Sequence, residues 1–178
     1  MSERGRFRLW SMIGITLLVA LPCSCAPRSL TLDDWRQATG GAKVDNLCQQ
    51  PGVKITSNMY AMAGLFDGSQ TVIRYVAKPY SMVLTWPQPV TFNTNTVLWG
   101  ADNFDYGTDF GLEYWDEAKG GYVLAYEEKA NTSKLSIHSF DPITTSKIRF
   151  TIFTCKTPSI ALSIARFQIA NVPGASQQ

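Results

Sequence analysis

The sequence has one histidine, His138, and the two other residue types of a nucleophilic triad lie near it, as Ser136 and Asp141. A triad requires the hydroxyl, the imidazole and the carboxylate to meet in one hydrogen-bonded line. Strand alternation would set Ser136 beside His138, whereas Asp141 leaves at an Asp-Pro turn. We therefore interpret His138 as a surface residue of a strand. The sequence also lacks the H-E-x-x-H and G-x-S-x-G motifs and a phosphate-binding glycine loop, so we predict that the chain is not an enzyme.

Three carboxylates, Asp102, Asp105 and Asp109, fall within eight residues of one another. Glycoside hydrolysis and cation binding both use carboxylates held close together. We favour the simpler interpretation that these are solvated acids of a loop. A small hydrolase remains the enzymatic alternative, and it depends on these residues alone.

The N-terminal residues have the order of an export signal. Arg4, Arg6 and Arg8 precede an apolar run from Leu9 to Leu21, and small or helix-breaking residues follow at 22–25. A membrane-spanning helix needs roughly 20 apolar residues, and this run stops short of that length. We therefore predict a signal peptide at 1–25 rather than a membrane anchor. We expect the mature chain to be exported to the periplasm or the cell surface.

Cys25 follows a stretch that resembles the bacterial lipoprotein box, in which small residues precede the modified cysteine, and Ser24 fits that pattern. Lipidation of Cys25 would tether the mature chain to a membrane. Free secretion is the alternative, because Pro22 and Cys23 fit the box less well. We expect contact with a membrane only through this lipid.

Loss of residues 1–25 removes three arginines and Glu3 from the 16 basic and 14 acidic residues of the chain, which leaves equal numbers of each. No basic stripe with aromatic residues between the charges remains, so we expect no nucleic-acid partner. Cys48 and Cys155 are then the two remaining cysteines. An oxidising compartment favours one disulfide between them, and two buried thiols are the alternative.

The rest of the sequence predicts an all-β fold. Residues 26–47 resemble a tether with one short helix at 31–38, and residues 171–178 resemble a flexible tail. Turn formers such as Pro87 with Pro89, Lys119 to Gly121, and Asp141 with Pro142 separate short, alternating segments. These segments predict strands at 53–57, 72–76, 80–86, 96–99, 110–115, 122–126, 134–138, 147–152 and 160–169. About eight short strands of this kind indicate one antiparallel β-sandwich over residues 48–170.

Five segments carry a more specific pattern. They are Ala63 to Gly68 with Thr71 and Tyr75, then Tyr80 to Trp86, Phe110 to Asp116, Ser146 to Ile152 and Ser163 to Ile169. In this order they resemble the strands and the Asp-Gly turn of the discoidin, or coagulation-factor type C-like, domain, which has the galactose-binding-like fold. The resemblance covers residues 46–170. It implies an eight-stranded jelly roll with its two ends side by side, which would bring Cys48 near Cys155.

The resemblance also bears on metal binding. Many members of that family hold calcium between the aspartate of the Asp-Gly turn, a nearby threonine and a glutamate of the last strand. Asp67 and Thr71 match the first two positions, but Arg166 stands at the third. A guanidinium would repel calcium and could pair with the carboxylate instead. We therefore expect no cofactor, and we predict an Arg166–Asp67 salt bridge in place of the metal.

Sugar-binding members of the family present aromatic rings and charged or amide groups on loops at one end of the sandwich. A ring stacks on the apolar face of a sugar, while planar polar groups bond its hydroxyls. The corresponding loops place Lys156 near this end. They also supply our candidate ligand-binding residues: Tyr75, Lys78, Trp99, Asp102, Asn103, Phe104, Asp105 and Tyr106. Trp99 ends an apolar strand, so a place in the core is the alternative for it.

The sequence therefore predicts a non-catalytic binding module of the cell envelope that recognises a carbohydrate or an envelope polysaccharide. The alternative is a structural subunit of the same fold that docks onto a partner protein, with the loop aromatics as interface anchors.

Overall fold

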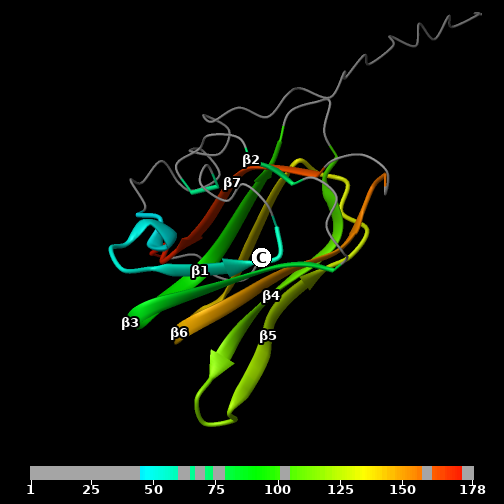
Figure 1. The fold of residues 1–178 in the computed structure, drawn as a ribbon. Helices are drawn as coiled ribbons and strands as arrows, with labels where there is room; N and C mark the ends of the chain where they lie inside the picture. The colour runs from blue at the N-terminus through cyan, green and yellow to red at the C-terminus, as the bar shows by residue number, and fades with distance from the viewer. Residues whose placement is uncertain are drawn as a thin grey trace, which may run out of the picture.

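Antiparallel strands make up most of the chain described by the computed structural model, which covers residues 45–59, 65–66, 71–73, 79–100, 105–157 and 162–173. A short 3-10 helix, η1 (Leu47–Gln49), precedes the first strand. The strands are β1 (Lys54–Ser57), β2 (Thr71–Ile73), β3 (Tyr80–Trp99), β4 (Gly107–Asp116), β5 (Gly121–Glu128), β6 (Leu135–Cys155) and β7 (Leu162–Ala170). Figure 1 shows their arrangement. Within these residues no helix has the length and hydropathy that a bilayer crossing requires.

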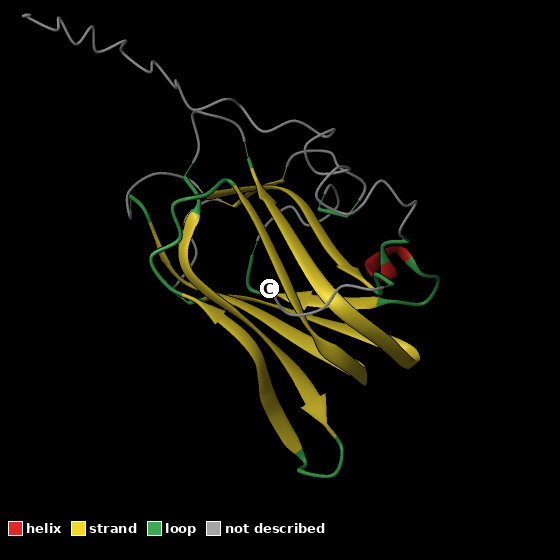
Figure 2. Ribbon diagram, turned by 180° about the vertical axis from the view of Figure 1, so that it is seen from behind, coloured by secondary structure: helices red, strands yellow, loops and turns green. Residues whose placement is uncertain are grey.

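The two long strands, β3 and β6, organise the sandwich because they pair with each other on both sides of a bend. The first half of β3 and the second half of β6 form one layer with β1, β4 and β5. The other halves form the second layer with β7 and β2. The strand order is therefore β2-β7-β3-β6-β4-β5, with β1 beside β3. Figures 1 and 2 show the two layers, with the β4–β5 hairpin extending past the bend.

The bends correct two turns expected from the sequence. Pro87 and Pro89, and likewise Asp141 with Pro142, lie inside continuous strands. The pairing of β3 with β6 shifts register between Thr85 and Val90, and again between Phe92 and Thr94. Such irregularities bend a strand and tolerate proline, because the missing N–H is not needed in the ladder. Four expected short segments are therefore halves of two long strands.

Other expected strands are confirmed. The predictions at 110–115 and 122–126 fall inside β4 and β5, and the turn at Lys119 to Gly121 contains Gly120 with a φ of +61°. Residues 53–57 contain β1, and residues 160–169 contain most of β7. The predicted signal peptide, the helix at 31–38 and the lipidation site Cys25 lie outside the described residues.

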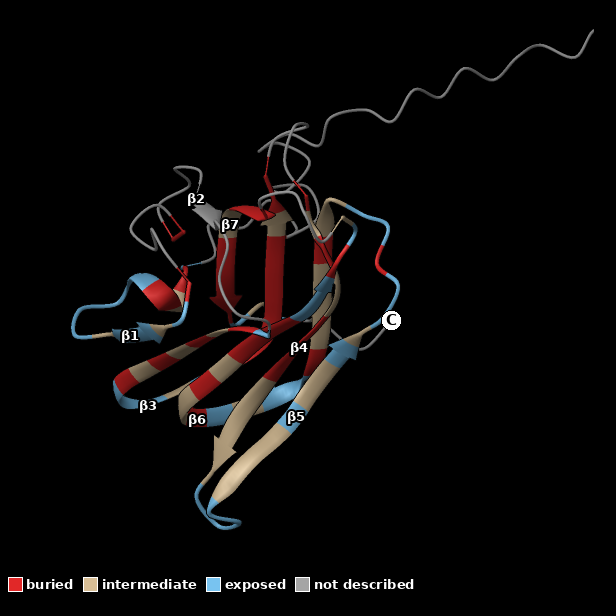
Figure 3. Cartoon of the chain, turned by 45° about the vertical axis from the view of Figure 1, so that its right-hand side comes forward, coloured by how far each residue is buried: buried red, intermediate tan, exposed pale blue. Residues whose placement is uncertain are grey.

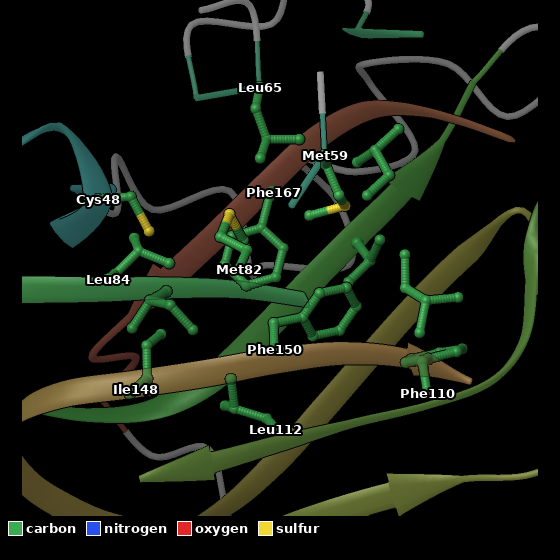
Figure 4. Close-up of a cluster of buried hydrophobic side chains, with 14 of the residues drawn as sticks. Cys48, Met59, Leu65, Met82, Leu84, Phe110, Leu112, Ile148, Phe150 and Phe167 are labelled. Carbon is green, nitrogen blue, oxygen red and sulfur yellow. The ribbon is translucent and has the colours of Figure 1, made fainter. Parts of the chain in front are cut away.

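The core lies between the two layers, where inward side chains of both meet (Figures 3 and 4). Phe150 of β6 packs on Phe167 of β7 with ring centroids 4.9 Å apart, and Trp99 of β3 meets Phe110 of β4 at 5.1 Å. These rings are almost wholly removed from solvent. Burial of large aromatic side chains is the main favourable term that holds two sheets together.

The expected disulfide is not formed: Cys48 and Cys155 are two buried thiols that are not joined. Beside Cys48, the backbone oxygen of Leu47 accepts a hydrogen bond from Trp86 Nε1. The pKa of the Tyr80 phenol is raised mainly by burial and further by Cys155, which therefore lies near it. Tyr80 and Trp86 are six residues apart on one strand, or about 20 Å at ~3.3 Å per residue. A disulfide needs Cα atoms within about 7 Å, so two cysteines whose neighbours lie this far apart along β3 are not placed to form one.

Candidate functional site

Tyr106, just before β4, and Lys156, just after β6, meet at one end of the sandwich, which we call the loop end. Lys156 follows β6, and its backbone N–H donates to the backbone carbonyl oxygen of Tyr106 at 3.2 Å. Its Nζ lies 5.5 Å from the centroid of the Tyr106 ring. Tyr106 is half-buried and Lys156 is exposed. An aromatic ring and an ammonium from segments 50 residues apart are thus held side by side at the surface.

Asp105, next to Tyr106 in the chain, is buried and helps to hold this pair in place. It is 5% exposed, and its Oδ2 accepts a short hydrogen bond from the Thr157 N–H. Its backbone oxygen accepts from Ser163 N at 3.2 Å, and the residue forms an isolated bridge with Leu162. Asp105 therefore joins the segment before β4 to the ends of β6 and β7.

Trp99 belongs to the core, the alternative that its place at the end of an apolar strand had suggested. Its side chain is 2% exposed, and its indole Nε1 donates to Ser136 Oγ at 3.3 Å. The ring lies so close to Gly107 that a Cβ built there would be 2.6 Å from Trp99 Cη2. Trp99 thus supports the loop end without presenting a ring face to a ligand.

The other five candidate ligand-binding residues lie outside the described residues: Tyr75, Lys78, Asp102, Asn103 and Phe104. Asp67 also lies outside, so its pairing with Arg166 stays a prediction. Arg166 is half-buried on β7 opposite Leu98, and Thr71 opens β2 opposite Ile164. In the part of the chain that the structure describes, no group of three His, Cys, Asp or Glu side chains could hold a metal ion.

Asp109, the third carboxylate of the sequence cluster, lies on β4 and is engaged within the protein. Its Oδ1 accepts from the Ala130 N–H at 2.9 Å, and its Oδ2 accepts a short bond from the Thr154 hydroxyl. The Thr154 bond is the main cause that lowers the pKa of this carboxyl. Asp105 and Asp109 thus both serve the local structure and do not form an open pair of carboxylates of the kind that hydrolysis uses.

His138 is not the surface residue that the sequence suggested. Its ring stacks on Tyr126 with centroids 3.8 Å apart, and its side chain is half-buried, with 16% of its area exposed. Burial lowers the pKa of its imidazole from 6.5 to about 4. Glu128 Oε2 lies 3.8 Å from Nε2, but the ring is neutral at pH 7, so this contact is not an ion pair there. The Ser136 hydroxyl is engaged by the indole of Trp99, and these residues form no triad.

Two hollows were not foreseen from the sequence. One, of about 320 Å³, is lined by Glu128, Asn131 and His138 among others. The second, of about 410 Å³, lies beside the turn of the β4–β5 hairpin and is lined by Tyr114, Asp116 and Thr144 among others. Some polar groups around them are already bonded within the protein, as Asn131 is to Gly107 and Asp116 is to Ala118. We take Tyr106 and Lys156, and not these hollows, as the candidate site.

A set of aromatic and basic side chains on the outer side of the hairpin layer was also missed: Trp115, Tyr122, Lys147 and Arg149. Lys147 Nζ lies 4.6 Å from the Trp115 ring centroid, and the Arg149 guanidinium lies 4.2 Å from that of Tyr122. The signal was present, because the predicted turn at Lys119 to Gly121 pairs Trp115 with Tyr122 across the hairpin.

No family model matches the sequence, and no curated protein matches it significantly. Solved structures do share the fold. The family 32 carbohydrate-binding module of Streptococcus pneumoniae EndoD is 21% identical over 71% of this chain and 99% of its own length, with a TM-score of 0.56. The family 32 module of C. perfringens NanJ, solved in complex with galactose, is 15% identical over 66% of this chain and 92% of that one, with a TM-score of 0.53.

SpGH29 is 14% identical over 72% of this chain with a TM-score of 0.61, but the chain spans only 28% of its length. The described domain thus corresponds in extent to the separate modules. These similarities confirm the predicted galactose-binding-like, discoidin-type β-sandwich.

Proposed function

We propose that this chain is a non-catalytic carbohydrate-binding module whose ligand contacts the loop end of the sandwich at Tyr106 and Lys156. The main support for the proposal is that the Tyr106 ring and the Lys156 ammonium lie side by side. Asp105 holds the two segments together through its bond to the Thr157 N–H. A tyrosine ring covers the C–H face of a sugar, and a lysine donates to its hydroxyls. The fold shared with modules that include one solved in complex with galactose supports this class of ligand.

Asn103 and Phe104 precede Tyr106 in the chain, and we propose that they complete the contact with the sugar. Trp99 and Asp105 hold the surface in shape and do not touch the ligand. The signal peptide and the lipid at Cys25 would place this module in the cell envelope, where polysaccharides are its natural partners.

A glycan array tests the proposal with the purified protein and two variants. We expect binding to at least one neutral glycan, and we expect Tyr106→Ala to weaken it about tenfold, the effect of losing roughly 1.4 kcal/mol of ring contact. Lys119→Gln changes an exposed lysine in the β4–β5 turn, at the opposite end of β4 from Tyr106, and should leave binding unchanged.

An array without any hit would contradict the proposal. Co-purification of a stoichiometric protein partner would then favour the docking subunit instead. Release of free sugar from a bound glycan would contradict the non-catalytic part alone.

A further inference from the structure

The outer side of the layer formed by β1, β3, β6, β4 and β5 carries two cross-strand rows of side chains. Strand pairing sets Lys54 opposite Thr85, and Thr85 opposite Lys147. Lys147 lies over Trp115, which pairs with Tyr122. Residues directly opposite in an antiparallel sheet share one face. The first row is therefore Lys54, Thr85, Lys147, Trp115 and Tyr122.

The second row runs beside it by the same pairing: Thr56, Val83, Arg149, Glu113 and Leu124. We call the two rows together the outer face. Each row crosses five strands, which is about 19 Å at ~4.8 Å between strands. Figure 3 shows that β4 and β5 are mostly half-buried or exposed along the hairpin, where the rows end. Leu124, at the end of the second row, is 55% exposed.

Among the described residues, the two lysines of the outer face have no acidic partner. No ion pair joins Lys54 or Lys147 to an acidic side chain within the described residues. Lys147 is instead held over the Trp115 ring, with Nζ 4.6 Å from its centroid. A ring attracts an ammonium but does not neutralise it as a carboxylate would. An anionic group of a ligand can therefore still pair with Lys147.

Arg149 is oriented on the same face. Its Nε and Nη2 donate to the two carboxylate oxygens of Glu113 at 2.6 and 2.8 Å, and its guanidinium covers the Tyr122 ring. This two-point bond fixes the plane of the guanidinium, and Nη1 is not used in it. The outer face thus carries three cations against the single carboxylate of Glu113.

We propose that the outer face is a second binding site, for an extended acidic polysaccharide whose carboxylate or sulfate groups pair with Lys147 and Lys54. The length of the rows suits a chain of sugars rather than a single one. Trp115 and Tyr122, with ring centroids 5.3 Å apart at 82°, supply apolar surface for the sugar rings between the charges. This site is separate from Tyr106 and Lys156, and either one can exist without the other.

Affinity gel electrophoresis of the full chain tests this site. The gels contain polygalacturonate, which carries carboxylates, heparin, which carries sulfates, or neutral dextran. We expect at least one acidic polysaccharide to retard the protein, less so at high salt, because exposed charges are screened. We expect Lys147→Gln to weaken this binding about five- to tenfold, and Lys54→Gln to weaken it by a smaller factor.

Lys129→Gln is the matched control, since it removes the same charge from a lysine that lies outside the two rows and is already paired with Glu127. It should change binding less than about twofold, as should Tyr106→Ala. Circular dichroism checks that each variant is folded. The proposal is overturned if neither acidic polysaccharide retards the protein, if Lys129→Gln weakens binding as much as Lys147→Gln, or if Tyr106→Ala alone abolishes it.

Discussion

At the scale of single residues, His138 makes the stability of the folded protein depend on pH. Its imidazole has a pKa lowered by burial to about 4, while in the unfolded chain it returns to about 6.5. Between these values the unfolded chain binds a proton that the folded chain does not. The free energy of unfolding therefore falls as the pH drops through this window.

We predict that His138→Phe, which keeps a ring on Tyr126, flattens this dependence. Urea unfolding at several pH values between 6.5 and about 4 measures it. If the free energy of unfolding falls equally with pH in the wild-type protein and the variant, His138 is not the group responsible for the pH dependence.

Gly107 is a second residue whose identity is set by its neighbours. A Cβ at this position would lie 2.6 Å from Trp99 Cη2 and 3.1 Å from Ile152 Cγ2. Both neighbours are buried, so neither can move away freely. We predict that Gly107→Ala destabilises the fold by about 1–3 kcal/mol. Gly121→Ala is the control, because its nearest neighbour is 4.0 Å away. Equal urea midpoints for the two variants would refute the close packing of Trp99.

At the scale of elements, Tyr126 ties the edge strand β5 to the opposite layer. Its hydroxyl donates to Asn95 Oδ1 at 2.5 Å, and Asn95 Nδ2 donates to the backbone oxygen of Gln168. Asn95 is fully buried, so the loss of this donor would leave its oxygen without a bond. We predict that Tyr126→Phe costs about 1–3 kcal/mol of stability. Tyr122→Phe removes the same group from the outer face and should cost far less in the same thermal unfolding experiment.

The sequence predicts some of these elements and not others, for identifiable reasons. The β4–β5 hairpin was evident, because alternation continues up to a glycine turn on both sides. The length of β3 and β6 was hidden, because Pro87 and Pro142 mark turns in most contexts. Here each proline lies among the extra residues of its own strand at a register shift in the β3–β6 pairing. That information belongs to the pairing of distant segments and cannot be read from the local sequence.

At the scale of the whole molecule, the described part of the sandwich is held without a disulfide between Cys48 and Cys155. We predict that Cys48 and Cys155 resist alkylation in the folded protein, because both are buried and burial raises the pKa of the Cys48 thiol. Unfolding without a reductant should expose both to alkylation, as mass spectrometry of their peptides would show. Modification of neither peptide until a reductant is added would mean that the bridge forms after all.

The candidate site shows the same limit of sequence-based prediction. The loop chemistry around Tyr106 could be predicted, because aromatic, amide and acidic residues gather in one glycine-bounded stretch. The separation of Trp99 and Asp105 from Tyr106 could not, since it depends on contacts with Ser136 and Thr157, far along the chain. The neutral charge balance of the predicted mature chain likewise concealed the local excess of cations on the outer face.

The most direct test of the account is a backbone amide NMR titration of the protein with a neutral glycan that it binds. We propose that a sugar contacts the protein at Tyr106 and Lys156 and is not cleaved. We therefore predict the largest shift changes at these two residues, with no new sugar species in the spectrum. Largest changes around His138, or the appearance of a cleaved sugar, would contradict it.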